Sequence, residues 1–150
     1  MNDLKKELYN QCLNYVQMRM DAAQQAINDA QKASTDDTKS SAGDKYETGR
    51  EMAQQETDRN MMQLNEANKL KVALNKISPD AVADKAETGS VVLTGSGNFY
   101  IAVSAGVLTV NNEQYFAISP ASPIGLKLLG QKKGAEFKLN DKIYHIKQVI

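Results

Sequence analysis

The residues whose types and spacing most clearly suggest chemistry are Asp44 and Glu47, in the segment Asp44-Lys45-Tyr46-Glu47. Carboxylates three residues apart at the start of a helix lie on one side of its first turn. Two oxygen ligands placed in this way can hold Mg²⁺, which takes one or two protein carboxylates and fills its other positions with water or phosphate. A metal held there could activate a water molecule or stabilise a leaving oxygen.

The same two acids also fit a structural role. Asp44 is a good helix N-cap, and Glu47 is its capping-box partner, at a helix end where the dipole favours negative charge. A D-x-x-E spacing is common, so without further context capping is the more frequent explanation. The two roles are compatible, because a capping carboxylate can still contact a cation.

These acids belong to an electronegative stretch of an otherwise neutral chain. The net charge of all 150 residues is zero, which argues against a general nucleic-acid-binding protein, because such proteins usually carry a basic surplus. Residues 36–58, in contrast, contain seven acids and three bases, which leaves a net charge of −4.

Two long helices are expected to position this stretch. Residues 1 to about 33 contain no Gly or Pro, and their apolar residues recur at helical spacing. The expected stripe of the first helix is Leu4, Leu8, Cys12, Tyr15, Ala22, Ala26 and Ala33. A second helix is expected from about Asp44 to Ile77, ending at Ser78-Pro79. Its expected stripe is Met52 or Ala53, Leu64, Ala67, Leu70, Leu74 and Ile77.

The short polar residues at 34–44 predict the turn between the helices, because such side chains compete with the helical backbone. We therefore expect an antiparallel hairpin over residues 1–78, with its acidic tip around 34–47. About 30 residues give a helix of roughly 45–50 Å. A polar turn favours an internal hairpin, and hence a monomer, over a coiled-coil dimer.

Residues 79–150 show the short apolar runs and turn residues of a small, mostly antiparallel sheet. Strands are expected near 91–93, 100–103, 107–110, 115–118, 136–139 and 142–149. Turns between them are expected at Gly95-Ser96-Gly97, Asn111-Asn112 and Asn140-Asp141. Ser122, Pro123 and Gly130 suit the N-cap, the first position and the residue past the end of one short helix. The fold class is therefore α+β.

The remaining reactive residue types favour structural roles. Cys12 lies on the first helical stripe and is expected to be a core residue, and His145 alternates with its strand neighbours as a packed or half-exposed residue. The methionines at 18, 20, 52, 61 and 62 could form a soft binding surface, but we expect them to fill helix packing. The absence of a signal peptide, of an apolar span and of a second cysteine indicates a reduced, cytoplasmic setting without a membrane.

A longer motif lies near the C-terminus. The segment Ile118-Ser-Pro-Ala-Ser122-Pro123-Ile124-Gly125, continued by Leu128-Leu-Gly-Gln-Lys132-Lys133-Gly134, resembles the I-S-x-x-S-P-I-(G/A)-x-x-L-(L/I)-G-K-x-x-G signature of the bacterial Gre transcript-cleavage factors. The chain length, the order of the domains and both junctions also resemble that family.

The resemblance implies a function and a partner. It implies an FKBP-like domain over 79–150 that docks on bacterial RNA polymerase, and a coiled coil that enters the secondary channel. Two tip acids of the family share the polymerase's catalytic Mg²⁺ and promote cleavage of backtracked RNA, so the RNA 3′ end is contacted only indirectly. Asp44 and Glu47 match this pair, and the chain itself would be neither an enzyme nor the holder of a cofactor.

The tip departs from the family sequence G-D-L-S-E-N-A-E-Y after the matching Gly43 and Asp44. Lys45 and Tyr46 replace Leu and Ser, and Thr48-Gly49-Arg50 follows Glu47. An alternative is therefore a channel-binding regulator that competes with cleavage factors but does not cleave.

Two further alternatives concern the C-terminal domain. Candidates for the polymerase contact are the small basic cluster Lys127, Lys132 and Lys133 and the motif residues Ser122, Pro123, Ile124 and Gly125, although a solvated lysine face is the default. A prolyl isomerase of FKBP type is disfavoured, because its pocket needs aromatic residues and several of the few rings here fall at core positions of strands.

Overall fold

The computed structural model describes residues 2–40, 44–79 and 81–150, and it describes side chains at 3–32, 51–79 and 81–150. The contacts divide the chain into two compact units. The sheet unit comprises residues 1–15 and 72–150, and the hairpin unit comprises residues 16–71. The first turns of one helix and the end of the next therefore group with the sheet.

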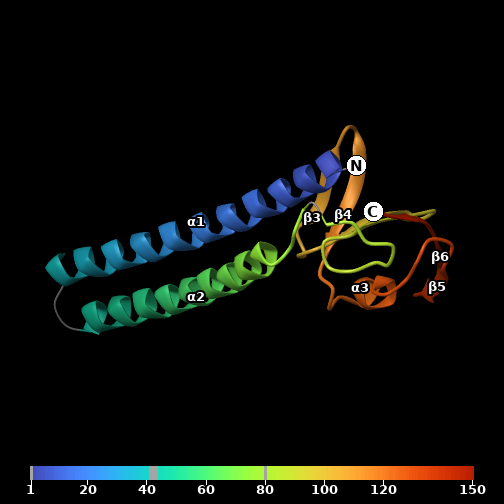
Figure 1. Cartoon of the computed structure of the whole chain (residues 1–150). Helices are drawn as coiled ribbons and strands as arrows, with labels where there is room; N and C mark the ends of the chain where they lie inside the picture. The colour runs from blue at the N-terminus through green and yellow to red at the C-terminus, as the bar shows by residue number, and fades with distance from the viewer. Residues whose placement is uncertain (1, 41–43, 80) are drawn as a thin grey trace. The chain divides into compact units, whose positions relative to one another are not determined.

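Two long helices form the N-terminal half. Helix α1 spans Asn2–Ser40 and helix α2 spans Asp44–Asn75, and Figure 1 shows them running in opposite directions. The predicted turn at 34–44 was too long, because residues 34–40 continue α1. No Gly or Pro stops the helix before Ser40, and extending an existing helix costs far less than starting one. The second helix ends at Asn75, two residues before the predicted Ile77.

The buried stripe of α1 also differs from the prediction beyond Cys12. Leu8 and Cys12 are buried as expected, but the predicted Tyr15, Ala22 and Ala26 are not. The buried positions are one residue away from these or between them: Val16, Ala23, Ile27 and Ala30. Ile27 has more apolar surface to remove from water than its neighbour Ala26, which favours the rotation of the helix that buries Ile27.

The buried positions of α2 are partly as predicted. Ala67, Leu74 and Ile77 are buried, but Met52 is 65% exposed. The sequence-based stripe left out Thr57, which is buried, and treated Asn60 as a polar interruption. Both lie at the helical spacing of the stripe, so the seam of the hairpin unit includes polar residues.

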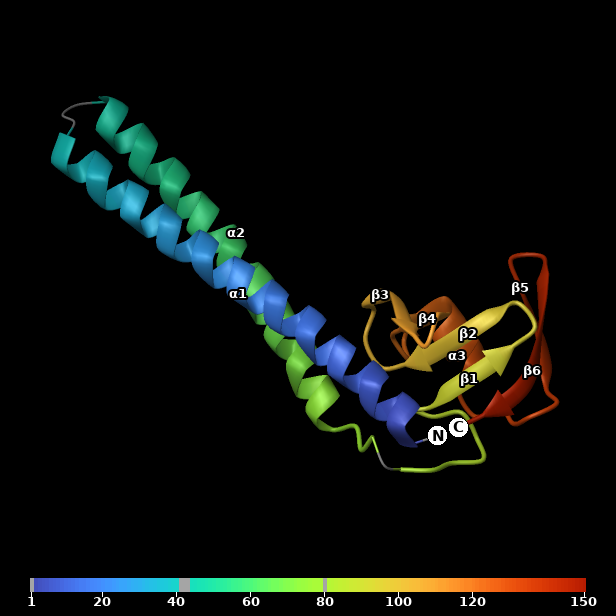
Figure 2. The same cartoon turned by 90° about the horizontal axis from the view of Figure 1, so that it is seen from above.

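The C-terminal half forms one six-stranded sheet in the order β3-β4-β2-β1-β6-β5. The strands are β1 (Val91–Thr94), β2 (Gly97–Ile101), β3 (Gly106–Val110), β4 (Glu113–Ile118), β5 (Glu136–Leu139) and β6 (Lys142–Val149). Four of the five pairings are antiparallel, and only β2 with β4 is parallel. Figure 2 shows β2, β1 and β6 side by side. The α+β class and the mostly antiparallel sheet are confirmed.

Tight turns fix the register of three hairpins. Gly95-Ser96 joins β1 to β2, as expected. Asn111-Asn112 and Asn140-Asp141 join the other two pairs with positive φ at both positions, between 52° and 66°. That geometry is a type I′ turn, which matches the twist of paired strands and which Asn and Asp tolerate better than most residues.

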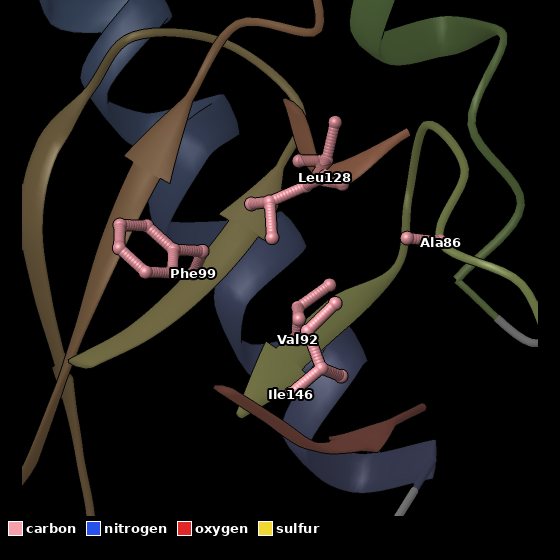
Figure 3. Close-up of a cluster of buried hydrophobic side chains, with 6 residues drawn as sticks. Ala86, Val92, Phe99, Leu128 and Ile146 are labelled. Atoms are coloured by element: carbon pink, nitrogen blue, oxygen red, sulfur yellow. The ribbon is translucent and has the colours of Figure 1, made fainter. Parts of the chain in front are cut away.

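One face of the sheet packs against helix α3 (Pro123–Leu128). Figure 3 shows the cluster, in which Leu128 of α3 meets Val92, Phe99 and Ile146 of three strands. The other buried members are Ala86 and Ile101. Burying a Leu, Ile or Phe side chain contributes roughly 1.5–3 kcal/mol, so this cluster is a principal source of stability.

The start of α1 belongs to the same unit. The amide of Gln11 donates to the Thr109 carbonyl at 3.0 Å. Cys12 and the strand residue Tyr100 are both fully buried, and burial, with a smaller contribution from the nearby Cys12, raises the pKa of the Tyr100 hydroxyl. The first three turns of α1 are thereby fixed to the sheet.

Candidate functional site

The structure places Asp44 and Glu47 in the first turn of α2, which begins at Asp44, four residues after α1 ends at Ser40. Helical backbone at both positions gives them the i, i+3 relation that the metal prediction requires. Gly43 and the side chains of Asp44 and Glu47 lie outside the described residues. Metal sharing and capping both stay predictions.

The motif around Ser122 is defined by a network of short-range hydrogen bonds. Ser122 is the N-cap of α3, and its Oγ accepts from the Gly125 amide at 3.1 Å. The same hydroxyl donates to the Ser119 carbonyl at 2.6 Å, while the Ser119 Oγ accepts from the Ala121 amide at 3.1 Å. Each hydroxyl therefore satisfies a backbone group that the helix start would leave unpaired.

Gly125 is required by close packing. A Cβ atom at this position would lie 2.2 Å from the Ser119 carbonyl oxygen and 2.9 Å from the Ser122 Oγ. No real Cβ approaches a backbone oxygen this closely. The backbone path into α3 is therefore determined by three residues of the Gre-like motif, Ser119, Ser122 and Gly125.

The predicted partner-binding residues fall into two groups. Ser122, Ile124 and Gly125 are half-buried or buried, and Ile124 packs against the core cluster. Pro123 and the three lysines Lys127, Lys132 and Lys133 are exposed. The backbone of Lys132 forms a bridge with Lys85, which places it at the edge of the unit's core.

The exposed lysines are part of a basic segment that the sequence-based analysis did not delimit. Residues 127–147 contain six lysines and two acids, a net charge of +4. Lys142 also lies over the Tyr144 ring, 5.6 Å from its centroid. The excess of lysines over acids in this segment can be read directly from the sequence.

Four methionines on the helices are exposed rather than packed, which corrects the expected role as filler. Their exposed fractions are 72% at Met18, 65% at Met52, 50% at Met61 and 68% at Met62. Exposed, flexible thioether side chains adapt to irregular apolar surfaces.

The remaining titratable candidates have structural settings. Burial raises the pKa of the Cys12 thiol to about 12, which makes it a poor nucleophile and confirms it as a core residue. His145 is half-exposed, and its Nδ1 lies 3.1 Å from Glu136 Oε1. Tyr100 has a hydroxyl with no hydrogen-bond partner among the described residues.

Lys5 is the residue that sequence reasoning missed. It is 3% exposed, and its Nζ donates to the Ala81 carbonyl at 2.5 Å. The available signal was its spacing, because Lys5 precedes Leu8 and Cys12 on the same helical stripe.

The described residues contain neither a cluster of metal ligands nor a membrane-spanning helix. No group of three or more His, Cys, Asp or Glu residues there could hold a metal ion. Among the helical segments that are described, none is both long and apolar enough to cross a membrane.

Comparison with known proteins gave one structural similarity. No protein-family model matches the chain, and no curated protein matches it. Among solved structures, the chain is similar to the one described as "Structure of the transcription factor Gfh1", with 18% identical residues. The similarity covers 89% of this chain and 90% of that chain, with a TM-score of 0.34.

Proposed function

We propose that this protein is a transcription factor of the Gre type that binds bacterial RNA polymerase. The observation that carries the proposal is the Ser119–Gly125 motif, in which the signature residues are tied to one specific α3 entry by hydrogen bonds and by a Cβ-excluding contact. The Gre signature accepts Gly or Ala at position 125, so the hydrogen bonds of Ser119 and Ser122 carry this argument, and the close packing of Gly125 is a feature of this chain.

The helices support the mode of action that the resemblance implies. At 1.5 Å per residue, the 32 residues of α2 extend about 48 Å. A helix pair of this length can enter the secondary channel of the polymerase, whose catalytic centre lies inside the enzyme. The exposed Met18, Met52, Met61 and Met62 would give the helices an adaptable apolar surface against the channel wall.

Asp44 and Glu47 would face the polymerase's Mg²⁺ and add two carboxylate oxygens to its coordination. The metal supplies the activation of water for RNA hydrolysis. This chain would contribute the two carboxylate ligands, which lie three residues apart on one face of α2. The protein would thereby stimulate the polymerase's own hydrolysis without being an enzyme.

The exposed Lys127, Lys132 and Lys133 are the proposed docking residues of the sheet unit. Their segment carries a net charge of +4, which favours an acidic partner surface. The buried members of the motif, Ser122 and Gly125, would act by holding α3 in place for this contact.

Transcript cleavage in stalled elongation complexes tests the proposal. We expect wild-type protein to shorten the RNA, and Asp44→Ala and Glu47→Ala each to reduce the rate at least tenfold while leaving polymerase binding intact. Glu51→Ala is the matched control, because Glu51 is an exposed acid of the same helix one turn further on. Equal cleavage by all four proteins would remove Asp44 and Glu47 from the chemistry.

The second candidate is a regulator that enters the channel without stimulating cleavage. It is favoured by the tip sequence, in which Lys45 places a positive charge between the two acids and Thr48-Gly49-Arg50 replaces the family residues. Polymerase binding with altered initiation or pausing, and with full-length transcripts, would select it. Failure to bind core polymerase would reject both candidates.

An FKBP-type isomerase is less well supported. Phe99, Tyr100 and Tyr115 are buried, and Phe137 and Tyr144 stack on each other with ring centroids 5.1 Å apart. Few rings are left to line a proline pocket. A positive assay on a proline-containing peptide would revive this function.

A further inference from the structure

The sheet unit contains a cavity of about 460 Å³ that the proposed function does not use. It is lined by residues from the start of α1, the end of α2 and the segment that leads to β1. Its volume lies within the range of small-molecule sites in proteins. All of its lining residues belong to the sheet unit, so the cavity is part of one compact body.

A buried cation forms part of the cavity wall. Lys5 is 3% exposed, and its ammonium group has three N–H donors. Of the described residues, only Ala81 offers it an acceptor, the carbonyl oxygen at 2.5 Å. Burial lowers the pKa of Lys5, while the Glu87 carboxylate opposes that shift. A cation beside a cavity, with N–H donors that no second described residue accepts, is well suited to bind an anionic group.

The part of the cavity wall formed by Glu87, Thr88 and Gly89 is held by hydrogen bonds. Gly89 has φ +96°, and its amide donates to the Ile101 carbonyl at 2.6 Å. Glu87 and Ser90 form a closed turn, with the Glu87 amide donating to Ser90 Oγ at 3.1 Å and the Ser90 amide donating to the Glu87 carbonyl at 2.9 Å. A cavity with such a wall does not need to be assembled when a ligand arrives, which lowers the cost of binding.

The chemistry of the lining defines the ligand class. Lys5 and Lys76 provide positive charge, Ser78 and Thr88 provide hydroxyl groups, and Ile77 contributes apolar surface. Glu87 also lines the cavity and would repel an anion with several charges. We propose that this cavity binds a small organic acid, with a single carboxylate on Lys5 and a short apolar body against Ile77.

Such a ligand would contact α1, α2 and the segment before β1 at once. Because it binds the folded sheet unit only, it would raise the stability of that unit with ligand concentration. The proposal is independent of polymerase binding, so its failure would leave the proposed function unaffected.

Amide chemical shifts of the full-length protein test the proposal, with acetate, hexanoate, benzoate and inorganic phosphate as separate probes at constant ionic strength. We expect saturable shifts at Ala81, Thr88 and Gly89 with hexanoate or benzoate, and at least fivefold weaker binding of acetate and phosphate. Saturation by phosphate alone, or no saturation by any probe, would overturn the organic-acid assignment.

Three variants locate the binding group. Lys5→Met keeps the length of the side chain without its charge and should weaken hexanoate binding about tenfold or more, since a charge-assisted hydrogen bond is lost. Lys76→Met removes an exposed charge and should weaken binding about two- to threefold without affecting folding. Lys69→Met, at an exposed lysine outside the cavity lining, should have no effect.

Asp80 adjoins Ala81 in the sequence and lies outside the described residues. An Asp80→Asn variant removes a negative charge next to Ala81 in the sequence and should bind hexanoate at least as tightly as wild type, because the ligand is itself an anion. If Lys5→Met fails to fold, Lys76→Met and Asp80→Asn still decide the matter. Unchanged hexanoate affinity of Lys76→Met, or loss of hexanoate binding by Asp80→Asn, would contradict the proposal.

Discussion

The sheet unit buries large side chains, whereas the hairpin unit buries mostly small ones. Leu8, Tyr100, Ile101, Leu128 and Ile146 are completely buried in the sheet unit. Among the described side chains of the hairpin unit, the buried ones are Val16, Ala23, Ile27, Ala30, Thr57 and Ala67. Small residues let two helices approach closely, but they remove less apolar surface from water. The hairpin unit is therefore narrow and weakly stabilised, and the sheet unit supplies most of the folding free energy.

The charges of the two regions differ as well. Residues 36–58 carry a net charge of −4, and residues 127–147 carry +4. The acidic stretch belongs to the hairpin unit and the basic stretch to the sheet unit, so the two units carry local charge of opposite sign. This comparison predicts different responses of the two units to substitution.

The largest effect is expected for Gly125→Ala. The added Cβ would overlap the Ser119 carbonyl oxygen, so the loop must move away from α3, and we expect a loss of about 3 kcal/mol or more in the free energy of unfolding. Urea denaturation followed by circular dichroism measures it. Gly95→Ala is the control, because its Cβ would meet only a Lys147 side-chain carbon at 3.9 Å. Equal stability of the two variants would mean that the motif is not tightly packed.

Truncation of buried isoleucines compares the two cores directly. Ile101→Ala in the sheet unit should destabilise by about 3–5 kcal/mol, and Ile27→Ala in the hairpin unit by about 2 kcal/mol or less. The reason is that Ile101 is enclosed by the core cluster, while Ile27 faces a thin helix pair that can close over the gap. Amide hydrogen exchange should show the Ile27 variant affecting only residues of the hairpin unit. A larger loss for Ile27→Ala would reverse the comparison.

Alkaline pH should destabilise the sheet unit first. Burial raises the pKa of Cys12 to about 12 and also raises that of Tyr100, so the folded state resists ionisation that the unfolded chain allows. The associated stability is complete below about pH 9 and is lost as pH rises toward 12, by about 2–4 kcal/mol at pH 11. Melting temperatures between pH 7 and 11 measure this loss. A Cys12→Ala, Tyr100→Phe double variant should show a flatter profile.

Asn60→Leu should stabilise the hairpin unit. The Asn60 Nδ2 is buried without a hydrogen-bond partner among the described residues, beside a small cleft lined by Arg19, Ala23 and Gln63. Replacing an unsatisfied amide by an apolar side chain should add about 1–2 kcal/mol. Asn65→Leu, at an exposed position of the same helix, is the control and should change stability little. A destabilised Asn60→Leu variant would show that the amide has a partner in solution.

The smallest effect is expected for Ser122→Ala. Loss of the N-cap should cost about 1 kcal/mol, since the Gly125 amide and the Ser119 carbonyl both lose the hydroxyl. Ser104→Ala, at an exposed position in the same unit, should be neutral. Thermal denaturation distinguishes the two, and an equal response would remove the capping role of Ser122.

The sequence by itself determined the elements whose signals are local. Ser122, Pro123 and Gly130 gave the bounds of α3, and Asn111-Asn112 and Asn140-Asp141 marked turns whose positive φ few other residues tolerate. The α+β class, the strands and the i, i+3 relation of Asp44 and Glu47 follow from spacing and turn chemistry alone. These features depend on neighbours within about four residues, which a sequence displays directly.

Only the tertiary structure decided which residues are buried. The stripe of α1 turned to Val16 and Ile27, the methionines were left exposed, and Lys5 was buried against Ala81, because each outcome depends on what packs opposite. The parallel pairing of β2 with β4 and the requirement for glycine at 125 likewise arise from segments brought together by folding. Whether a residue is buried depends on both of the surfaces that pack together, and the sequence of one helix specifies only one of them.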